Sequence, residues 1–319
     1  MSSKRNSGLE LLRLLLIFGV VVEHTVGQCV YVRHGADYLS NWCVCGFVFL
    51  TAWFGVKFNV VKCLKLVALG LWCAFVSNYM FVFNGGGVTS AIKGYRFLWA
   101  YIILMCFAPI IEKAFASCSR KEKLQLSVPI LFLVYGWCFL CAVPKVRDFV
   151  PCPKGVGGCS FLSLIGIYVM VGIYKEFDLG RFCTRKNAMF ALPLCTIAML
   201  SGFWWYWWIP AFVVTCFTFE FFRRCELSSR LERIVLFFSP SAFAVYLLHF
   251  TRGGLTRMSE IEVFFHEKCG LPLWLVFVIT AVVTYICCLC LDVIRRGLLH
   301  VGSAVVERLM PHRPLVTND

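Results

Sequence analysis

The chain has 319 residues, of which 60% are hydrophobic and only 15% charged, and its mean hydropathy is +0.79. This composition excludes a water-soluble single domain of this size, because 31 basic and 17 acidic residues in short clusters cannot cover its surface. The formal net charge of +14 is explained by membrane topology and contact with anionic lipid, so no nucleic-acid partner is expected.

Apolar stretches of about 17 to 22 residues recur along the chain, close to the length that crosses a hydrocarbon core as an α-helix. Ten spans are predicted: 9–28, 41–60, 64–83, 95–116, 126–143, 158–175, 188–202, 204–222, 234–251 and 273–294. Only Ser201 and Gly202 separate the seventh from the eighth, so one long tilted helix or a re-entrant segment is the alternative there. The predicted fold class is all-α: a polytopic membrane helical bundle of about ten transmembrane helices, forming a single membrane domain over residues 1–319.

Basic residues between the predicted spans favour one side of the membrane. If the first residues lie inside, 21 lysines and arginines fall on inner segments and nine on outer segments. This positive-inside pattern predicts a multi-pass protein of the cell (inner or plasma) membrane with both termini in the cytoplasm. The first stretch is expected to remain as a helix and not to be cleaved as a signal peptide, because Arg13, Glu23 and His24 interrupt it.

Most of the 19 cysteines fall within predicted spans, where they act as small apolar residues. The sequence has no pair of CxxC motifs at zinc spacing, and Cys43 and Cys45 would point to different sides of a helix, so no metal site is predicted. Cys152 and Cys159 share an outer loop and its edge. They either form a disulfide in an oxidising compartment or stay free, and both alternatives remain open.

Ionisable groups within membrane spans are costly, and they are therefore the first place to look for function. Glu10 and Arg13 of the first span are one turn apart and can neutralise each other at the inner boundary. Glu23 and His24 follow roughly 16 Å further along the helix. In the alternative without a functional role, Arg13 reaches to lipid phosphate and His24 is a neutral, hydrogen-bonded side chain in the outer headgroup zone.

A second histidine, His249, ends the ninth predicted span. That span runs outward like the first, so His24 and His249 should reach a similar depth. An imidazole can take a proton from a sugar hydroxyl, and His249 or Tyr246 could orient it or the acyl carbonyl. The arrangement suits acyl transfer from a thioester to an alcohol, and direct attack by the acceptor needs no nucleophilic serine of the GxSxG type, which the sequence lacks.

The first residues also carry a resemblance to a known family. Residues 5–13 (RNSGLELLR), followed after ten residues by His24, resemble the opening of the acyltransferase 3 family of membrane acyltransferases, whose hallmark is an arginine, ten residues and a histidine. Three later blocks resemble its basic second inner segment, its central helix and its late Tyr-Leu-x-His block: 53–65 (WFGVKFNVVKCLK), 97–109 (FLWAYIILMCFAP) and 245–249 (VYLLH). The resemblance covers nearly the whole chain.

The resemblance implies a membrane O-acyltransferase that takes an acyl group, usually acetyl, from acyl-coenzyme A (acetyl-CoA) on the cytoplasmic side. The acceptor would be a hydroxyl of a cell-surface polysaccharide or its lipid-linked precursor, a glycan in either case. His24 would be the catalytic histidine and Arg13 its partner in the motif, with Glu10 beside it. Coenzyme A would be held by Arg13, Lys62 and Lys65. The two lysines stand where many members have Arg-x-x-Arg, so they would attract phosphate without bidentate geometry, or would simply form a basic inner loop.

The main rival interpretation is a transporter or flippase of a glycan or lipid intermediate, which would also place ionisable groups within its spans. It predicts internal repeats and helices interrupted near the midplane, and the sequence shows no corresponding pair. For the acyltransferase, the sequence leaves two routes open: direct transfer to the acceptor, or a relay through an acyl-histidine.

Overall fold

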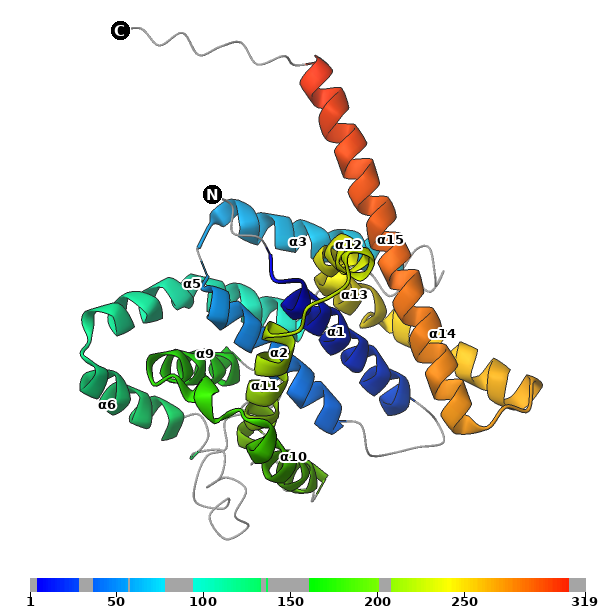
Figure 1. Cartoon of the computed structure of the whole chain (residues 1–319). Coiled ribbons are helices and arrows are strands. Elements are labelled where there is room, and N and C mark those ends of the chain that lie inside the picture. Colours follow the sequence, from blue (N-terminus) through cyan, green and yellow to red (C-terminus); the bar gives the residue numbers. More distant parts are fainter. Residues whose placement is uncertain are drawn as a thin grey trace, which may run out of the picture.

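The computed structural model describes residues 5–28, 37–56, 58–77, 94–132, 136, 161–200 and 208–309. Nearly all of these residues are helical and none of them forms a strand, which confirms the all-α prediction (Figure 1). The helices, in chain order, are α1 (Ser7–Gln28), α2 (Asp37–Phe54), α3 (Val60–Phe75), α5 (Arg96–Ser117), α6 (Arg120–Leu131), α9 (Phe161–Glu176), α10 (Arg185–Leu200), α11 (Trp208–Arg223), α12 (Ser229–Phe238), α13 (Ala242–His249), α14 (Arg252–Val263) and α15 (Leu273–Leu309).

Helices α1 and α2 form the centre of the bundle (Figure 1). Asn6 caps the start of α1, because its side-chain oxygen accepts a hydrogen bond from the N–H of Leu9 at 3.0 Å. Gly46 of α2 lets the two helices approach closely: a Cβ at that position would lie 2.7 Å from the side chain of Leu16. The side chain of Leu16 therefore packs directly against the backbone of α2 at Gly46.

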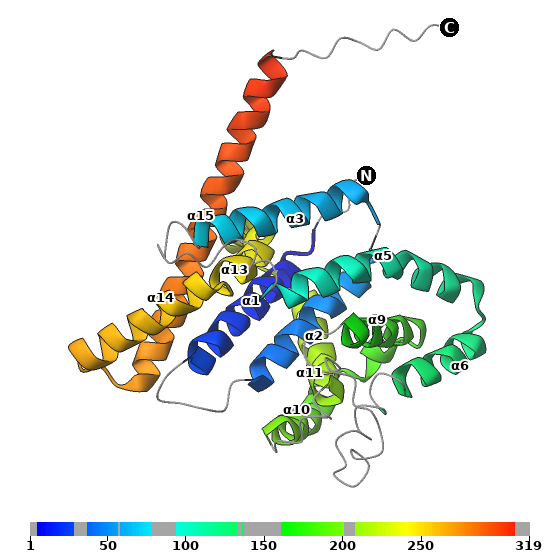
Figure 2. The ribbon, with the colours of Figure 1, turned by 180° about the vertical axis from the view of Figure 1, so that it is seen from behind.

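The other helices surround this pair. Helix α1 also packs against α11, α13 and α15, while α2 packs against α9 and α11. Helix α3 lies across α13 and contacts α5 (Figure 2). One continuous core of buried apolar side chains results, and it includes residues of α1, α2, α5, α9, α11 and α13. The described helices therefore form a single packed body.

The seventh and eighth predicted spans form two separate helices. Helix α10 ends at Leu200, α11 begins at Trp208, and the two helices pack against each other. A single long helix through this block is therefore excluded, since its two halves could not make contact. The choice between two spans and a re-entrant segment at this point stays a prediction.

The ninth predicted span is a helix with a break. Helix α12 runs to Phe238, a short 3₁₀ turn covers Ser239–Ser241, and α13 follows. Pro240 lies in that turn, where its missing N–H and fixed φ favour the change of helix type. Helix α14 was not predicted, because its polar composition resembles that of an outer loop; Thr251 caps it by accepting a hydrogen bond from the N–H of Gly254 at 2.9 Å.

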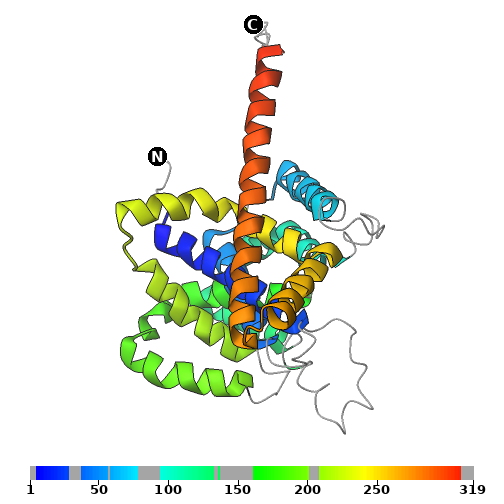
Figure 3. The same ribbon diagram turned by 90° about the vertical axis from the view of Figure 1, so that its right-hand side faces the viewer.

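Helix α15 is much longer than predicted. Its 37 residues correspond to about 55 Å at the α-helical rise, against a hydrocarbon core of about 30 Å. The prediction ended at residue 294 because charged side chains begin there, but helix formation continues through polar sequence. Figure 3 shows the C-terminal part of α15 extending beyond the other helices.

Membrane character follows from the described helices. Three of them are long and apolar enough to cross a bilayer, and they cover 96–117, 229–249 and 273–301. A shorter apolar helix covers Asn41–Phe54. The count of ten spans and the cytoplasmic placement of the termini stay predictions, as parts of the third and fifth predicted spans lie outside the described residues. Cys152 and Cys159 also lie outside them.

Candidate active site

The two histidines predicted to share a depth are in direct contact. Nδ1 of His24 on α1 lies 2.8 Å from Nε2 of His249 at the end of α13, a hydrogen-bond distance. The side chain of His24 is 13% exposed, and His249 is only 1% exposed. These residues are 225 positions apart in the sequence, so the fold itself assembles the pair.

A tight corner between α13 and α14 holds His249 in place. Only two residues separate the end of α13 from the start of α14, and Gly254 sits against the end of α13. A Cβ on Gly254 would lie 2.5 Å from the carbonyl oxygen of His249, so only glycine permits this approach. The Thr251 hydroxyl, which caps α14, also forms a hydrogen bond with the Ser77 hydroxyl near the end of α3. The last turn of α13 is therefore fixed from two sides.

The hydrogen bonds determine which ring nitrogens carry protons. Nδ1 of His249 lies 2.6 Å from the carbonyl oxygen of Val245. A carbonyl only accepts, so this nitrogen carries the hydrogen and Nε2 of neutral His249 is an acceptor. His24 must then donate from Nδ1, which leaves Nε2 of neutral His24 with its lone pair. The pair thus presents one basic nitrogen, on His24.

A carboxylate accompanies that basic nitrogen. Oε2 of Glu23 lies 3.0 Å from Nε2 of His24, outside hydrogen-bond geometry, and it has no hydrogen-bond partner among the described residues. Glu23 itself is only 8% exposed. A carboxylate at this distance can stabilise a positive charge that forms on the imidazole during a reaction. The sequence places Glu23 next to His24, but it did not predict that Glu23 acts on the charge of the His24 imidazole.

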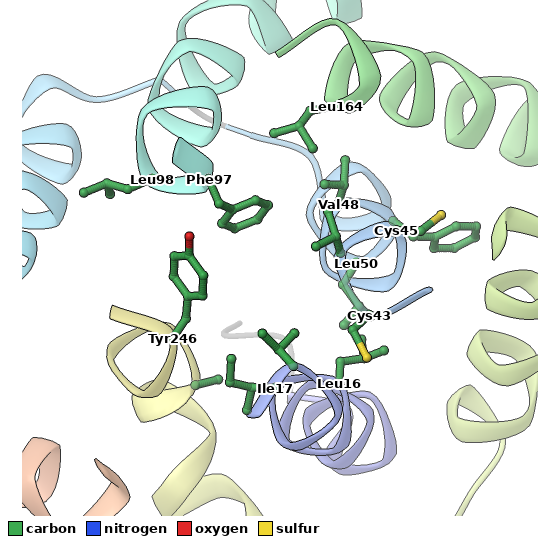
Figure 4. Packing of buried hydrophobic residues seen from close by; sticks show 14 of the residues in the cluster. Leu16, Ile17, Cys43, Cys45, Val48, Leu50, Phe97, Leu98, Leu164 and Tyr246 are labelled. Carbon is green, nitrogen blue, oxygen red and sulfur yellow. The ribbon is translucent and has the colours of Figure 1, made fainter. Parts of the chain in front are cut away.

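An apolar cavity of about 60 Å³ opens beside His24. Its ten lining residues come from α1, α2, α5 and the α13 region, and only His24 and Tyr246 bring polar side chains. The ring of Phe250 covers His24 at a centroid distance of 4.5 Å. Figure 4 shows Ile17, Phe97 and Tyr246 converging from α1, α5 and α13, with the Tyr246 hydroxyl directed toward α5. Tyr246 therefore belongs to the wall of this cavity.

Glu10 and Arg13 form the predicted ion pair near the start of α1. Nη1 of Arg13 lies 2.7 Å from Oε2 of Glu10. Glu10 is buried, whereas the Arg13 side chain is 30% exposed. The acidic group in the first turn is also favoured by the positive end of the helix. Among the described residues, no other group accepts a hydrogen bond from the Arg13 guanidinium, which leaves donors for an anion.

One face of α1 connects the two ends of the candidate site. Arg13, Ile17, Val20 and His24 follow one another at intervals of four, three and four residues. Eleven residues make about three full turns, so Arg13 and His24 project from the same side, roughly 16 Å apart. Ile17, Val20 and His24 all line the cavity. The arginine, ten residues and histidine of the motif therefore place both side chains on one stripe.

The structure does not bring the two lysines into this site. Lys62 and Lys65 are exposed on α3, and among the described residues no hydrogen bond or ion pair connects either side chain to α1. The Asn59 side chain caps α3 by accepting from the N–H groups of Val61 and Lys62, at 2.8 and 3.3 Å. The role of Lys62 and Lys65 in holding coenzyme A stays a prediction, and Arg13 is the basic residue on the stripe.

Comparison with known families identifies the family of the chain. A family model described as an acyltransferase domain, that of the acyltransferase 3 family, matches residues 6–293, essentially the whole chain. Comparison with curated proteins and with solved structures gives no match. The match contains all the residues of the stripe, the histidine pair and Glu23. The chain therefore belongs to the acyltransferase 3 family, and it is a membrane acyltransferase.

Proposed function

We propose that this protein is an acyl-CoA-dependent O-acyltransferase of the cell membrane. It would take an acyl group, acetyl by preference, from coenzyme A on the cytoplasmic side and transfer it to a hydroxyl of a surface polysaccharide or its lipid-linked precursor. The observation that carries the proposal is the 2.8 Å contact between His24 and His249, which leaves a basic nitrogen beside an apolar cavity.

The proposed step uses Nε2 of His24 as a general base. It takes the proton of the acceptor hydroxyl while the hydroxyl oxygen forms a bond to the thioester carbonyl carbon. The carbon–sulfur bond then breaks, and the departing thiolate receives the proton back from the imidazolium, which yields an ester and free coenzyme A. His249 accepts the Nδ1–H throughout and so keeps His24 in the reactive tautomer. Glu23 stabilises the transient imidazolium.

The stripe on α1 suggests how coenzyme A is held. Arg13 would bind a phosphate group near the cytoplasmic surface with the guanidinium donors that Glu10 does not use. The long pantetheine arm would follow Ile17 and Val20 toward His24. Lys62 and Lys65, both exposed on α3, would attract the polyanionic nucleotide to this side without touching it closely.

The transfer could also run as a relay through an acyl-histidine. Oε2 of Glu23 lies 3.0 Å from Nε2 of His24, so either an acceptor hydroxyl or an acyl group has to displace this carboxylate when it reaches Nε2. Both routes place a positive charge on the imidazole, because the hydrogen on Nδ1 stays in the bond to His249, and Glu23 would stabilise that charge in either case. Glu23 therefore does not decide between the two routes, and direct transfer is proposed as the one with fewer steps.

Release of coenzyme A thiol tests the proposal. The purified protein in lipid nanodiscs is mixed with acetyl-CoA and membrane glycan extract, and thiol release and glycan-bound label from [¹⁴C]acetyl-CoA are followed. Wild type and His300→Ala, a control at an exposed histidine of α15, should be active, whereas His24→Ala should lose about 10²- to 10⁴-fold in rate. Full activity of a correctly inserted His24→Ala protein would remove His24 from the mechanism, and vectorial movement of glycan without thiol release would support the transporter.

A further inference from the structure

We propose that the cavity beside His24 is the acyl pocket and that it limits the donor to short acyl groups, with Phe243 as the residue that sets the length. This inference rests on the proposed function and specifies its donor. The acyl carbon must lie next to the hydroxyl that His24 activates, so the chain attached to that carbon has to enter the space adjoining the imidazole.

The lining of the cavity matches an acyl group. The polar side chains, His24 and Tyr246, are two of the ten that line it, and the other eight are apolar. An acyl group has the same character, with one carbonyl at the reacting end and hydrocarbon beyond it. A sugar ring would leave its hydroxyl groups unpaired against these walls, which disfavours the acceptor as occupant.

The volume of the cavity sets the length. An apolar cavity of about 150 Å³ takes up benzene, which corresponds to roughly 25 Å³ for each heavy atom. By that measure the cavity of about 60 Å³ holds roughly two or three heavy atoms, which is an acetyl group. A butyryl group has two more carbons than this space can take.

Three aromatic rings make the cavity wall rigid. Phe97, Phe243 and Tyr246 contact one another, with ring centroids 5.6 to 6.2 Å apart. Phe97 and Tyr246 are buried, so their positions are fixed by the core, whereas Phe243 is only half-buried. Truncation of Phe243 therefore enlarges the cavity with the smallest disturbance of the fold. Val44 of α2 is buried and also lines the cavity, and Val44→Ile would fill it.

Binding of stable thioethers tests the pocket without an acceptor. Wild type in nanodiscs is titrated with S-ethyl-, S-butyl- and S-hexyl-coenzyme A, and with coenzyme A itself. Phe243→Ala and Val44→Ile are compared with Phe238→Ala, a partly buried phenylalanine that packs on the core and does not line the cavity. Thermal unfolding confirms that each variant is folded.

One extra or missing methylene in an apolar pocket changes binding affinity about 10-fold to 200-fold. The expected results follow from this range. Wild type and Phe238→Ala should bind S-ethyl-coenzyme A at least about tenfold more tightly than S-butyl-coenzyme A. Phe243→Ala should abolish or reverse this preference. Val44→Ile should bind S-ethyl-coenzyme A about tenfold more weakly than wild type does. Equal binding of all three thioethers to wild type, or an unchanged preference in both cavity variants, would overturn the acyl pocket and leave the proposed function standing. Failure of every coenzyme A compound to bind would overturn both.

Discussion

Removal of His249 should disable His24 without touching the substrate. His249 is the only described group that accepts the Nδ1–H of His24, at 2.8 Å, and it is buried. In His249→Ala that N–H has no partner. The proton is then free to move to Nε2, where it can be donated to the Glu23 carboxylate 3.0 Å away after a small rotation of the ring. This tautomer has no basic nitrogen facing the acceptor.

The size of the effect follows from this competition. A hydrogen bond to a charged group contributes about 1.5 to 3 kcal/mol, and each 1.4 kcal/mol changes an equilibrium about tenfold. The reactive tautomer should therefore fall to about one part in 10 to one part in 150, and kcat with it. The KM for acetyl-CoA should stay unchanged, because the donor is held along α1.

Steady-state measurements of thiol release distinguish a loss of the reactive tautomer from a general loss of structure in these variants. His249→Gln should recover part of the activity, since its side-chain carbonyl can accept the Nδ1–H, whereas His249→Ala should not. The double variant with His24→Ala should be no slower than His24→Ala alone, as the two residues act as a unit. A support role for His249 is refuted if His249→Ala keeps more than half of wild-type kcat. It is also refuted if the losses in kcat of the two single variants multiply in the double variant.

Three further changes probe other parts of the site. Glu23→Gln, similar in size but uncharged, should lower kcat about 10- to 100-fold at constant KM because the imidazolium loses its counter-charge; an unchanged kcat in the thiol assay would contradict this. Arg13→Ala, combined with Glu10→Gln so that no buried carboxylate is left unpaired, should raise the KM for acetyl-CoA about tenfold or more through a lost phosphate contact; a change confined to kcat would argue against that role. Gly46→Val should destabilise the protein by about 1 to 3 kcal/mol, measured by thermal unfolding in detergent, because α1 and α2 cannot stay so close; Gly297→Val, where the new side chain meets open space, is the control, and equal unfolding temperatures would exclude a tight α1–α2 contact.

Features that depend on a single segment of the chain could be predicted from sequence patterns. The apolar stretches predicted most helices, and the spacing of Glu10 and Arg13 predicted their ion pair, now seen at 2.7 Å. The predicted similar depth of His24 and His249 is confirmed by their contact. Depth could be read from the sequence because span boundaries are set by hydrophobic length, which is a property of each segment alone.

Features that depend on packing between distant segments could not be predicted. The cavity arises where α1, α2, α5 and α13 meet, and Gly254 matters only because the backbone of His249 lies against it. Helix α14 was missed since its residues are polar and its stability comes from the Thr251 cap and from neighbouring helices. Glu23 was visible beside His24, but its relation to Nε2 depends on the ring orientation that His249 imposes.

The most direct test of the account is the position of a bound donor. A structure of the protein in nanodiscs with a stable ketone analogue of acetyl-CoA would locate the acyl carbonyl carbon relative to His24. We predict this carbon within about 6 Å of Nε2, a distance that leaves room for one acceptor oxygen in hydrogen-bond and attack range, with the methyl group inside the cavity and a phosphate near Arg13. An acyl group bound away from α1, with His24 out of reach of the carbonyl, would contradict the central claim.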